Sequence, residues 1–304
     1  MIDPHTKWLG VFGDLNVAKN SKLGPAPHKP LMLLALMDLI ESGEFSDSWI
    51  PYDIRLVQYF RDYWPIVVER RQNQPEIRMP FHALGSDGIW NRFTEERTPS
   101  RAKETTAFCE IDASLLACLQ APGFRLAARK VLITTYFTAL EQVALAARLD
   151  MELPDSTEIA NIKADQSAFK ASLKNGRDSR FKTLVVSGYQ HTCLLTGYKL
   201  TTIDRTLVEA AHIHQHARSG NDKPTNGLAL SPNAHWAFDA GLWTAEATGN
   251  DLIIRVARKQ IHEAGPLALS LSAYEKRPFQ FPENSTLRPD PKHFDWHQRN
   301  CFIG

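Results

Sequence analysis

The sequence predicts an α+β protein with an N-terminal helical domain that carries a small β-hairpin, and a C-terminal domain built around a strand, a loop and a helix. Three observations support this fold class. The 304 residues exceed the usual size of one domain. Apolar runs with helical spacing dominate the first half. At residues 206–241 a β-rich segment leads into a loop rich in Gly, Asn, Asp and Pro, and Pro232 then opens a helix.

Composition narrows the class of protein. Hydrophobic residues make up 43% and charged residues 23%, which is ordinary for a soluble globular chain. The longest apolar run, Leu31–Met37, is too short to cross a bilayer, and the N-terminus lacks a basic stretch followed by an apolar run. We therefore expect a cytoplasmic protein with no membrane partner. The net charge of +1 means that any attraction to nucleic acid must come from local basic patches.

The cysteines form no CxxC pair, which argues against a zinc knuckle and against a disulfide framework. We expect reduced, mostly buried thiols and no structural zinc. The four residues are Cys109, Cys118, Cys193 and Cys301.

The first elements of the chain read as two packed helices. Pro30 fits the first turn of a helix over Leu31–Ile40, and Gly43 fits its end. This helix is apolar on most faces, which predicts a central place in the core. A second helix beside it is indicated by apolar residues at helical spacing, namely Ile54, Val57, Phe60 and Trp64.

The pattern then changes to a predicted hairpin. Ile77–Leu84 reads as an extended segment, residues 86–88 (SDG) as a turn and residues 89–93 (IWNRF) as the returning strand. A hairpin attached to helices is a common way to build a surface that recognises a ligand.

Three short motifs in this half, HKP at 28–30, PFHAL at 80–84 and DGIW at 87–90, resemble the sulfur-binding domain of phosphorothioate-dependent restriction endonucleases. The resemblance implies a shallow apolar pocket for the backbone sulfur, formed by Pro80 and Ala83, with His28 and Lys29 on the DNA backbone. Sulfur is less strongly hydrated than oxygen, so an apolar pocket should favour it. Met79 stands where this family has a tyrosine, which changes one wall of the pocket.

Two other interpretations of the first half stay open. Pro80 also fits an edge strand and His28 a loop before a helix, with no ligand at either. The domain also suits a reader of modified cytosine, which would need an aromatic pocket for a flipped base. Tryptophans that could supply such a pocket are Trp49, Trp64 and Trp90.

The middle of the chain reads as a helical pair, Thr105–Gln120 and Phe124–Asp150. Its segment Ala127–Ala147 either packs the two halves together or forms a dimer interface. The composition becomes acidic and polar at Met151–Lys163, which is the best boundary. We therefore predict a modified-DNA reader with a helical extension over 1–150, a linker over 151–165 and a nuclease domain over 166–304.

A basic helical stretch follows the boundary, within Ser167–Tyr189. Arg177 and Arg180 are candidates for contacts to DNA phosphates, although a solvated helix face explains single lysines equally well. The neighbouring basic residues are Lys170, Lys174 and Lys182.

Three correctly ordered pieces in the second half, EAAHI at 209–213, NGL at 226–228 and HxxFDxG at 235–241, resemble the HNH, or ββα-metal, endonucleases. The resemblance implies a ββα fold and a divalent metal such as Mg²⁺ or Mn²⁺. It also implies hydrolysis of phosphodiester bonds that leaves a 5′-phosphate and a 3′-hydroxyl.

Each signature residue has a chemical role that its type can perform. His212 is the candidate general base, since an imidazole is mostly neutral near pH 7. Asn226 is a loop residue that can bridge backbone groups and so hold His212 in place. His235 and Asp239, four apart on a helix, face the same way and can bind one metal.

One position departs from the commonest pattern of this family, because Ala211 replaces the metal ligand that often precedes the base. Glu209 is the candidate replacement donor. His214 and His216 are further candidates, and His293 and His297 suggest either a second metal site or caps on the packing of Trp296.

Together these features predict a modification-dependent restriction endonuclease acting on double-stranded, phosphorothioate-modified DNA, and a homodimer, since cutting two strands with one site per chain is easier for a dimer. The alternatives are an HNH endonuclease that reads modified cytosine or unmodified sequence, and a DNA-binding regulator with a degenerate nuclease fold.

Overall fold

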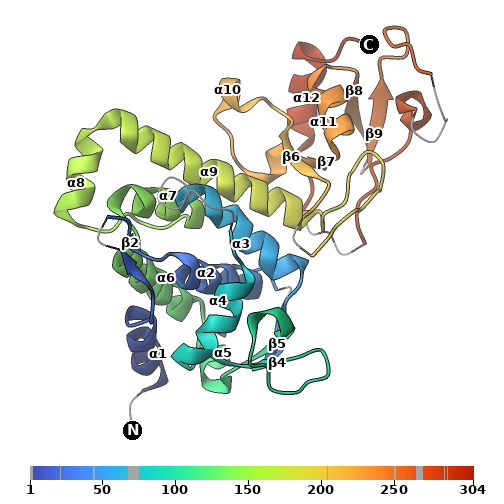
Figure 1. Ribbon diagram of the computed structural model, residues 1–304. Coiled ribbons are helices and arrows are strands. Elements are labelled where there is room, and N and C mark those ends of the chain that lie inside the picture. Colours follow the sequence, from blue (N-terminus) through green and yellow to red (C-terminus); the bar gives the residue numbers. More distant parts are fainter. Residues whose placement is uncertain are drawn as a thin grey trace. The chain divides into compact units, whose positions relative to one another are not determined.

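The computed structural model describes residues 3–20, 22–43, 45–67, 75–203, 205–249, 251–264, 270–283, 285 and 287–304. The chain divides into two compact units, Met1–Ser179 and Arg180–Gly304 (Figure 1). The first is mainly helical and the second holds small antiparallel sheets, which confirms the predicted α+β class. In the described part of the chain, no helix has the length and apolar character needed to span a membrane.

Helix α2 (His28–Glu41) forms the centre of the first unit, as predicted, and nearly all of its side chains are buried. Pro30 lies in its first turn, and Gly43 follows its end with a φ of +77°. It packs against α3 (Ile54–Val67), the second predicted helix. Further helices complete this core: α1 (Pro4–Gly13), α5 (Ala113–Gln120), α6 (Pro122–Tyr136) and α7 (Ala139–Leu149).

The predicted hairpin at 77–93 is wrong in its first strand. Residues 78–83 form helix α4 (Arg78–Ala83), followed by a 3-10 turn, η1 (Leu84–Asp87). A proline is tolerated here because Pro80 lies in the first turn, where its missing N–H would have no helical partner. The returning strand exists as β4 (Trp90–Phe93), but it pairs with β5 (Phe108–Ile111), which also pairs with β3 (Trp49–Pro51).

The predicted helical pair also needs correction at two places. The stretch from Thr105 contains β5, and α5 begins only after Asp112, whose carboxylate accepts from the N–H groups of Ser114 and Leu115. The long second helix is divided into α6 and α7, because Thr138 caps α7 in a reciprocal capping box with Glu141.

A buried ionic network joins the helices of the first unit. Oδ1 of Asp38 lies 2.8 Å from Nη2 of Arg129, and Oδ2 accepts from the Tyr63 hydroxyl at 2.7 Å and lies 3.4 Å from Nη2 of Arg148. The Arg148 guanidinium also covers the Tyr63 ring, 3.9 Å from its centroid. Burial raises the pKa of Tyr63, so its hydroxyl keeps the proton that it donates to Asp38.

Helix α8 (Thr157–Ala164) lies within the predicted linker and packs against α7. Helix α9 (Gln166–Gly188) follows it and crosses the division between the two units. The assignment of residues 151–165 as a linker stays a prediction.

The second unit contains the predicted ββα arrangement. Strand β6 (Glu209–His212) pairs antiparallel with β7 (Gly227–Leu230), and α11 (Pro232–Asp239) follows at once. The hairpin β8 (Trp243–Thr248) and β9 (Asp251–Val256) comes next. The other elements in the described part of the chain are short or terminal: β1 (Lys19–Asn20), β2 (Gly24–Pro25), η2 (Lys103–Thr105), α10 (His216–Ser219), η3 (Pro224–Asn226), η5 (Leu271–Tyr274) and α12 (Pro291–Asn300).

Several aromatic rings pack together in the core of this unit. The Phe238 ring stacks on His297 of α12 at 3.8 Å and lies 4.8 Å from Trp243.

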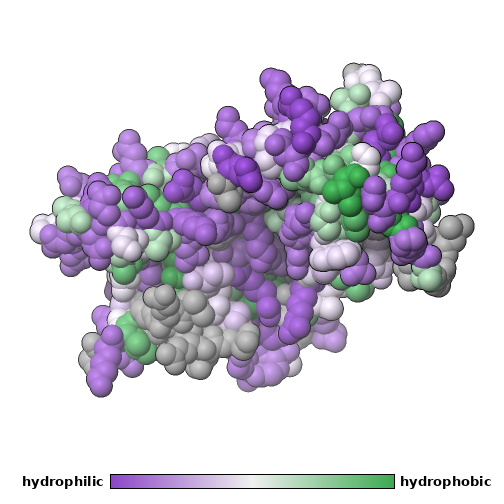
Figure 2. All heavy atoms as spheres, turned by 90° about the horizontal axis from the view of Figure 1, so that it is seen from above, coloured by the Kyte–Doolittle hydropathy of each residue, from purple (hydrophilic) through white to green (hydrophobic). Residues whose placement is uncertain are grey.

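The three buried cysteines are Cys109, Cys118 and Cys193, and Cys301 is partly exposed. Hydrophilic side chains cover most of the face shown in Figure 2, where hydrophobic ones form scattered patches.

Acid should destabilise the chain through His297. This side chain is buried, with Nδ1 3.0 Å from Thr244 Oγ1 and Nε2 3.2 Å from the Phe238 carbonyl oxygen, and burial lowers its pKa to about 4. The unfolded chain, with a pKa near 6.5, therefore binds more protons between these values, and stability falls as pH falls through this window. We expect a loss of about 2 kcal/mol between pH 7.5 and 5.

The measurement is the melting temperature at both pH values. His297→Gln, whose amide can keep both hydrogen bonds, should reduce the acid-induced decrease, whereas His262→Gln, at an exposed position of the same unit, should not. Equal decreases in the parent and His297→Gln would contradict this explanation.

Candidate nuclease site and DNA-reading surface

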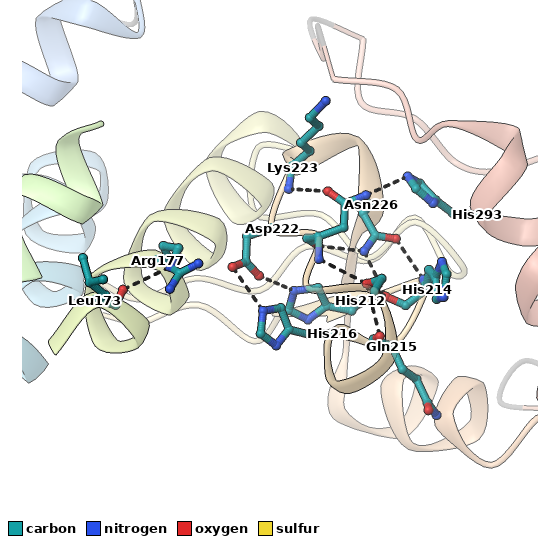
Figure 3. Close-up of polar contacts among 12 residues, drawn as sticks. Leu173, Arg177, His212, His214, Gln215, His216, Asp222, Lys223, Asn226 and His293 are labelled. Atoms are coloured by element: carbon teal, nitrogen blue, oxygen red, sulfur yellow. Dashed lines mark hydrogen bonds and ion pairs between the residues drawn. The ribbon is translucent and has the colours of Figure 1, made fainter. Parts of the chain in front are cut away.

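His212, the candidate base, ends strand β6 opposite Gly227 of β7. Its ring stacks on Phe181 of α9, with centroids 3.8 Å apart and planes inclined by only 4°. Its Nε2 lies 3.1 Å from Oδ1 of Asp222, a residue of the loop between the two strands (Figure 3). The imidazole is thus held by an aromatic face and by a carboxylate.

Gly227 permits the close approach of β7 to α9 behind this histidine. A Cβ at this position would collide with the Val185 side chain and lie 2.9 Å from Cζ of Phe181. Any other residue would therefore push the strand away from the helix that supports the His212 ring.

Asn226 is completely buried and connects two parts of the loop. Its Oδ1 accepts from the His214 N–H at 2.8 Å, while Nδ2 donates to the carbonyl oxygens of His214 and Asn221, both at 2.9 Å (Figure 3). A side-chain amide is suited to this position because its oxygen accepts while its NH₂ group donates two hydrogen bonds. The side chain bridges backbone groups, and its role in catalysis stays a prediction.

The other loop histidines have different surroundings. Nε2 of His216 lies 3.3 Å from Oδ2 of Asp222, so one carboxylate faces two imidazoles. The His214 ring stacks on Trp296 of α12 at 4.0 Å. Trp296 thus packs α12 onto the loop that follows β6, and the neighbouring His297 is buried in the core of the same unit.

The predicted metal donors Glu209 and Asp239 both lie beside the ring of His235 in α11. Its Nδ1 lies 3.0 Å from Oε2 of Glu209, and its Nε2 lies 3.4 Å from Oδ2 of Asp239. Both carboxylates are more than half exposed, so the cluster opens to solvent. Glu209 and Asp239 sit at different nitrogens of one ring, and therefore cannot both join His235 on a single ion in this arrangement.

No group of three His, Cys, Asp or Glu side chains within the described ranges has a geometry that could hold a metal ion by itself. His235 Nε2 and Asp239 nevertheless form a convergent pair, four residues apart on one helix. Ions such as Mg²⁺ keep several waters and are often bound by one or two carboxylates together with substrate phosphates. A pair of donors supported by Glu209 fits such an ion.

Glu209 and His212 are the first and last residues of β6, and three residues of strand span about 10 Å. The strand thus carries one residue of each cluster, Glu209 of the cluster around His235 at its start and His212 of the cluster around Asp222 at its end.

In the first unit, the predicted sulfur pocket lies on α4. Met79, Pro80 and Ala83 share one side of this short helix, since residues three and four apart are neighbours. Pro80 is buried, while Met79 and Ala83 are partly exposed. The side of α4 therefore offers a small apolar contact area rather than a deep pocket.

His28 and Lys29, the two residues predicted to contact the DNA backbone, lie at the start of α2 and have different surroundings. The Lys29 ammonium is nearly buried and binds Asp87 at 2.5 Å and the Asn16 carbonyl oxygen at 2.7 Å. The ammonium group of Lys29 therefore binds partners within the protein, and its contact with DNA stays a prediction. The His28 ring is partly exposed and lies 5.0 Å from the Trp64 ring.

Basic side chains that the sequence did not single out lie on α4 and beside it. Nη1 of Arg92 lies 3.1 Å from Nε2 of His82, whose Nδ1 lies 2.7 Å from Thr106 Oγ1. Burial and the Arg92 charge lower the pKa of His82. A Cβ on Gly85 would lie 2.7 Å from Nε of Arg92, so the arginine side chain rests on this glycine.

Two more arginines of the same unit lie over aromatic rings. The guanidinium of Arg78 lies 4.2 Å from the centroid of the Tyr52 ring, and that of Arg97 lies 4.2 Å from the Trp49 centroid. Arginines held by such contacts are well suited to phosphates. In the sequence, these arginines could be recognised only by their positions on either side of the PFHAL motif at 80–84.

The tryptophans proposed for a flipped base belong largely to the core. Trp64 and Trp90 are buried, and Nε1 of Trp90 donates to the Phe81 carbonyl oxygen at 3.0 Å. Trp49 packs between Phe93 and Arg97. These contacts do not favour a reader of modified cytosine.

The predicted phosphate contacts of α9 lie three residues apart. Arg177 is exposed, with Nε donating to the Leu173 carbonyl oxygen at 3.4 Å (Figure 3), and Arg180 is half-buried. Their role stays a prediction.

Comparisons with known proteins agree with both resemblances. Residues 193–245 match the model of a family described as HNH endonuclease, and residues 5–153 match that of the ScoMcrA-like, DNA sulfur-binding domain. The chain thus carries an HNH endonuclease domain after a DNA sulfur-binding domain.

A search of curated proteins found no significant match. Among solved structures, the chain is similar to the "Modification dependent TagI restriction endonuclease", with 22% identity and a TM-score of 0.31 over 41% of this chain. The match spans 38% of the length of that protein.

Proposed function

We propose that this chain is a modification-dependent restriction endonuclease that binds phosphorothioate-modified double-stranded DNA through its first unit and hydrolyses phosphodiester bonds with its second. The observation that carries the proposal is the presence, in one chain, of a DNA sulfur-binding domain and an HNH endonuclease domain. The pairing of His212 with Asp222 and of His235 with Glu209, within the ββα arrangement, supports a hydrolytic site.

His212 takes the proton from the attacking water, since a neutral imidazole is a suitable base near pH 7. Asn226 holds the loop that follows this histidine through its contacts with the backbone of His214 and Asn221. His235 and Asp239 hold a divalent metal such as Mg²⁺ or Mn²⁺, and Glu209 orients the His235 ring. When bound, the ion stabilises the negative charge on the phosphorane and on the leaving 3′ oxygen, and the products carry a 5′-phosphate and a 3′-hydroxyl.

In the reader unit, the apolar side of α4 supplies the contact for sulfur, and the arginines on and beside this helix supply contacts for the flanking phosphates. Sulfur is larger and less strongly hydrated than oxygen, so its transfer to the area around Met79 and Ala83 is less costly. A homodimer would place two nuclease sites on the two strands.

The experiment compares matched duplexes with and without one phosphorothioate linkage. We expect the full chain to bind the modified duplex at least roughly tenfold more tightly, a difference of about 1.4 kcal/mol. Ala83→Asp, which places a carboxylate beside the sulfur, should abolish this preference. Thr135→Asp adds the same charge at an exposed site of α6 and should not. Cleavage should stop when a chelator exceeds the metal.

Each outcome has its own meaning. Equal affinity for the two duplexes would exclude recognition of sulfur while leaving a nuclease that reads another feature of DNA. Undiminished cleavage in excess chelator would exclude the metal mechanism. Binding without any cleavage over a range of divalent metals would indicate a regulator.

A further inference from the structure

Asp222 occupies a position that neither motif assigns. It lies between α10 and η3, with its side chain only 14% exposed, although the surrounding loop is rich in residues typical of turns. Its two oxygens face different rings, Oδ1 towards Nε2 of His212 at 3.1 Å and Oδ2 towards Nε2 of His216 at 3.3 Å (Figure 3). A largely buried carboxylate is thus placed at the edge of the candidate base.

The surrounding structure fixes this carboxylate. The carbonyl oxygen of the preceding residue, Asn221, accepts from the buried Asn226 side chain, which also binds both backbone groups of His214. Asn226 therefore anchors the chain two residues after His212 and one residue before Asp222. Phe181 stacks on one face of the His212 ring and the carboxylate of Asp222 lies at the ring edge, so both contacts restrain the orientation of the ring.

We propose that Asp222 is a positioning residue for His212 in the hydrolytic reaction. An ionised carboxylate only accepts hydrogen bonds, so it holds the tautomer with the proton on Nε2, in which Nδ1 carries the lone pair. Nδ1 then takes the proton from the attacking water, and the charge that forms on the imidazole lies next to the carboxylate. The inference rests on the proposed nuclease function.

Asp222→Asn and Asp222→Ala test this role in the full chain. Both should lower kcat for cleavage of the modified duplex, the alanine variant by roughly 10- to 100-fold, as for other outer partners of functional histidines. KM for the duplex and the melting temperature of Asp222→Asn should stay close to the parental values, because the amide keeps the shape of the side chain. Asp251→Asn, which removes an exposed carboxylate from β9, should leave kcat unchanged.

A second readout does not need cleavage. The titration of the His212 ring, followed by NMR, should move to lower pH in Asp222→Asn, because the nearby negative charge that favours the imidazolium is gone. His216 is the other titratable group facing this carboxylate, so the titration is repeated in His216→Gln, where the shift should persist.

The possible results separate the two proposals. Parental kcat and an unmoved titration in both Asp222 variants would overturn the positioning role. A shifted titration in a chain that does not cut DNA would support the pairing of Asp222 with His212 and contradict the nuclease function. If kcat fell while the titration stayed fixed, Asp222 would act elsewhere in the site, and the proposal would also fail.

Discussion

Replacement of His212 by alanine is expected to slow cleavage of the modified duplex by roughly 10²- to 10⁴-fold, the usual contribution of a positioned base. The ring is held by Phe181 and Asp222 at the end of β6, so its loss removes the proton acceptor that the site holds in place. Single-turnover cleavage with excess protein measures this chemical step directly. The affinity for the duplex should change little, because the base contributes to the transition state rather than to binding.

His262→Ala serves as the matched control, since this exposed histidine lies in the same unit and outside the site. Cleavage at the parental rate by His212→Ala would show that another group accepts the proton. His216→Ala would then be the next variant to measure, because His216 faces the same carboxylate.

In the first unit, Asp38→Ala should lower the free energy of unfolding by about 3–5 kcal/mol, the cost of removing one partner from a buried ion pair. Asp38 faces both Arg129 and Arg148, whose side chains are 7% and 2% exposed. Without the carboxylate, two positive charges stay inside the helical core. Hydrogen exchange of α2 peptides at increasing urea concentration measures this loss in the first unit alone.

Glu41→Ala provides the comparison, because Glu41 also binds Arg129, at 2.6 Å, but is half-exposed. Water screens its charge, and its removal should cost about 1 kcal/mol or less. Similar decreases in the free energy of unfolding for the two variants would mean that the burial of Asp38 does not increase its contribution to stability.

The elements that the sequence predicted well are those with local signals. Pro30 and Gly43 delimit α2, and Pro232 opens α11, because proline and glycine act on the backbone within one turn. The spacing of His212, Asn226 and His235 follows from the same local order of strand, loop and helix. These residues could be placed without knowledge of distant contacts.

The failures have a common physical origin in contacts between distant residues. Ile77–Leu84 was expected to pair with β4, but the partner of β4 is Phe108–Ile111, and pairing over such a distance leaves no local signal. In the same way, nothing near Lys29 shows that Asp87 will neutralise it. In the sequence, Asp222 has the properties of an ordinary turn residue, and only the fold shows that it lies next to His212.

Phe181 and Val185 precede the region that matches the HNH family, yet they belong to the buried core of the same unit as His212. At the other end, Phe294 and His297 of α12 cover Phe238 after that region has ended. The recognisable motif is therefore only the middle of a cooperative folding unit. A nuclease fragment cut to the borders of the motif would expose both of its apolar faces to water, and an autonomous one must begin before Phe181 and retain α12.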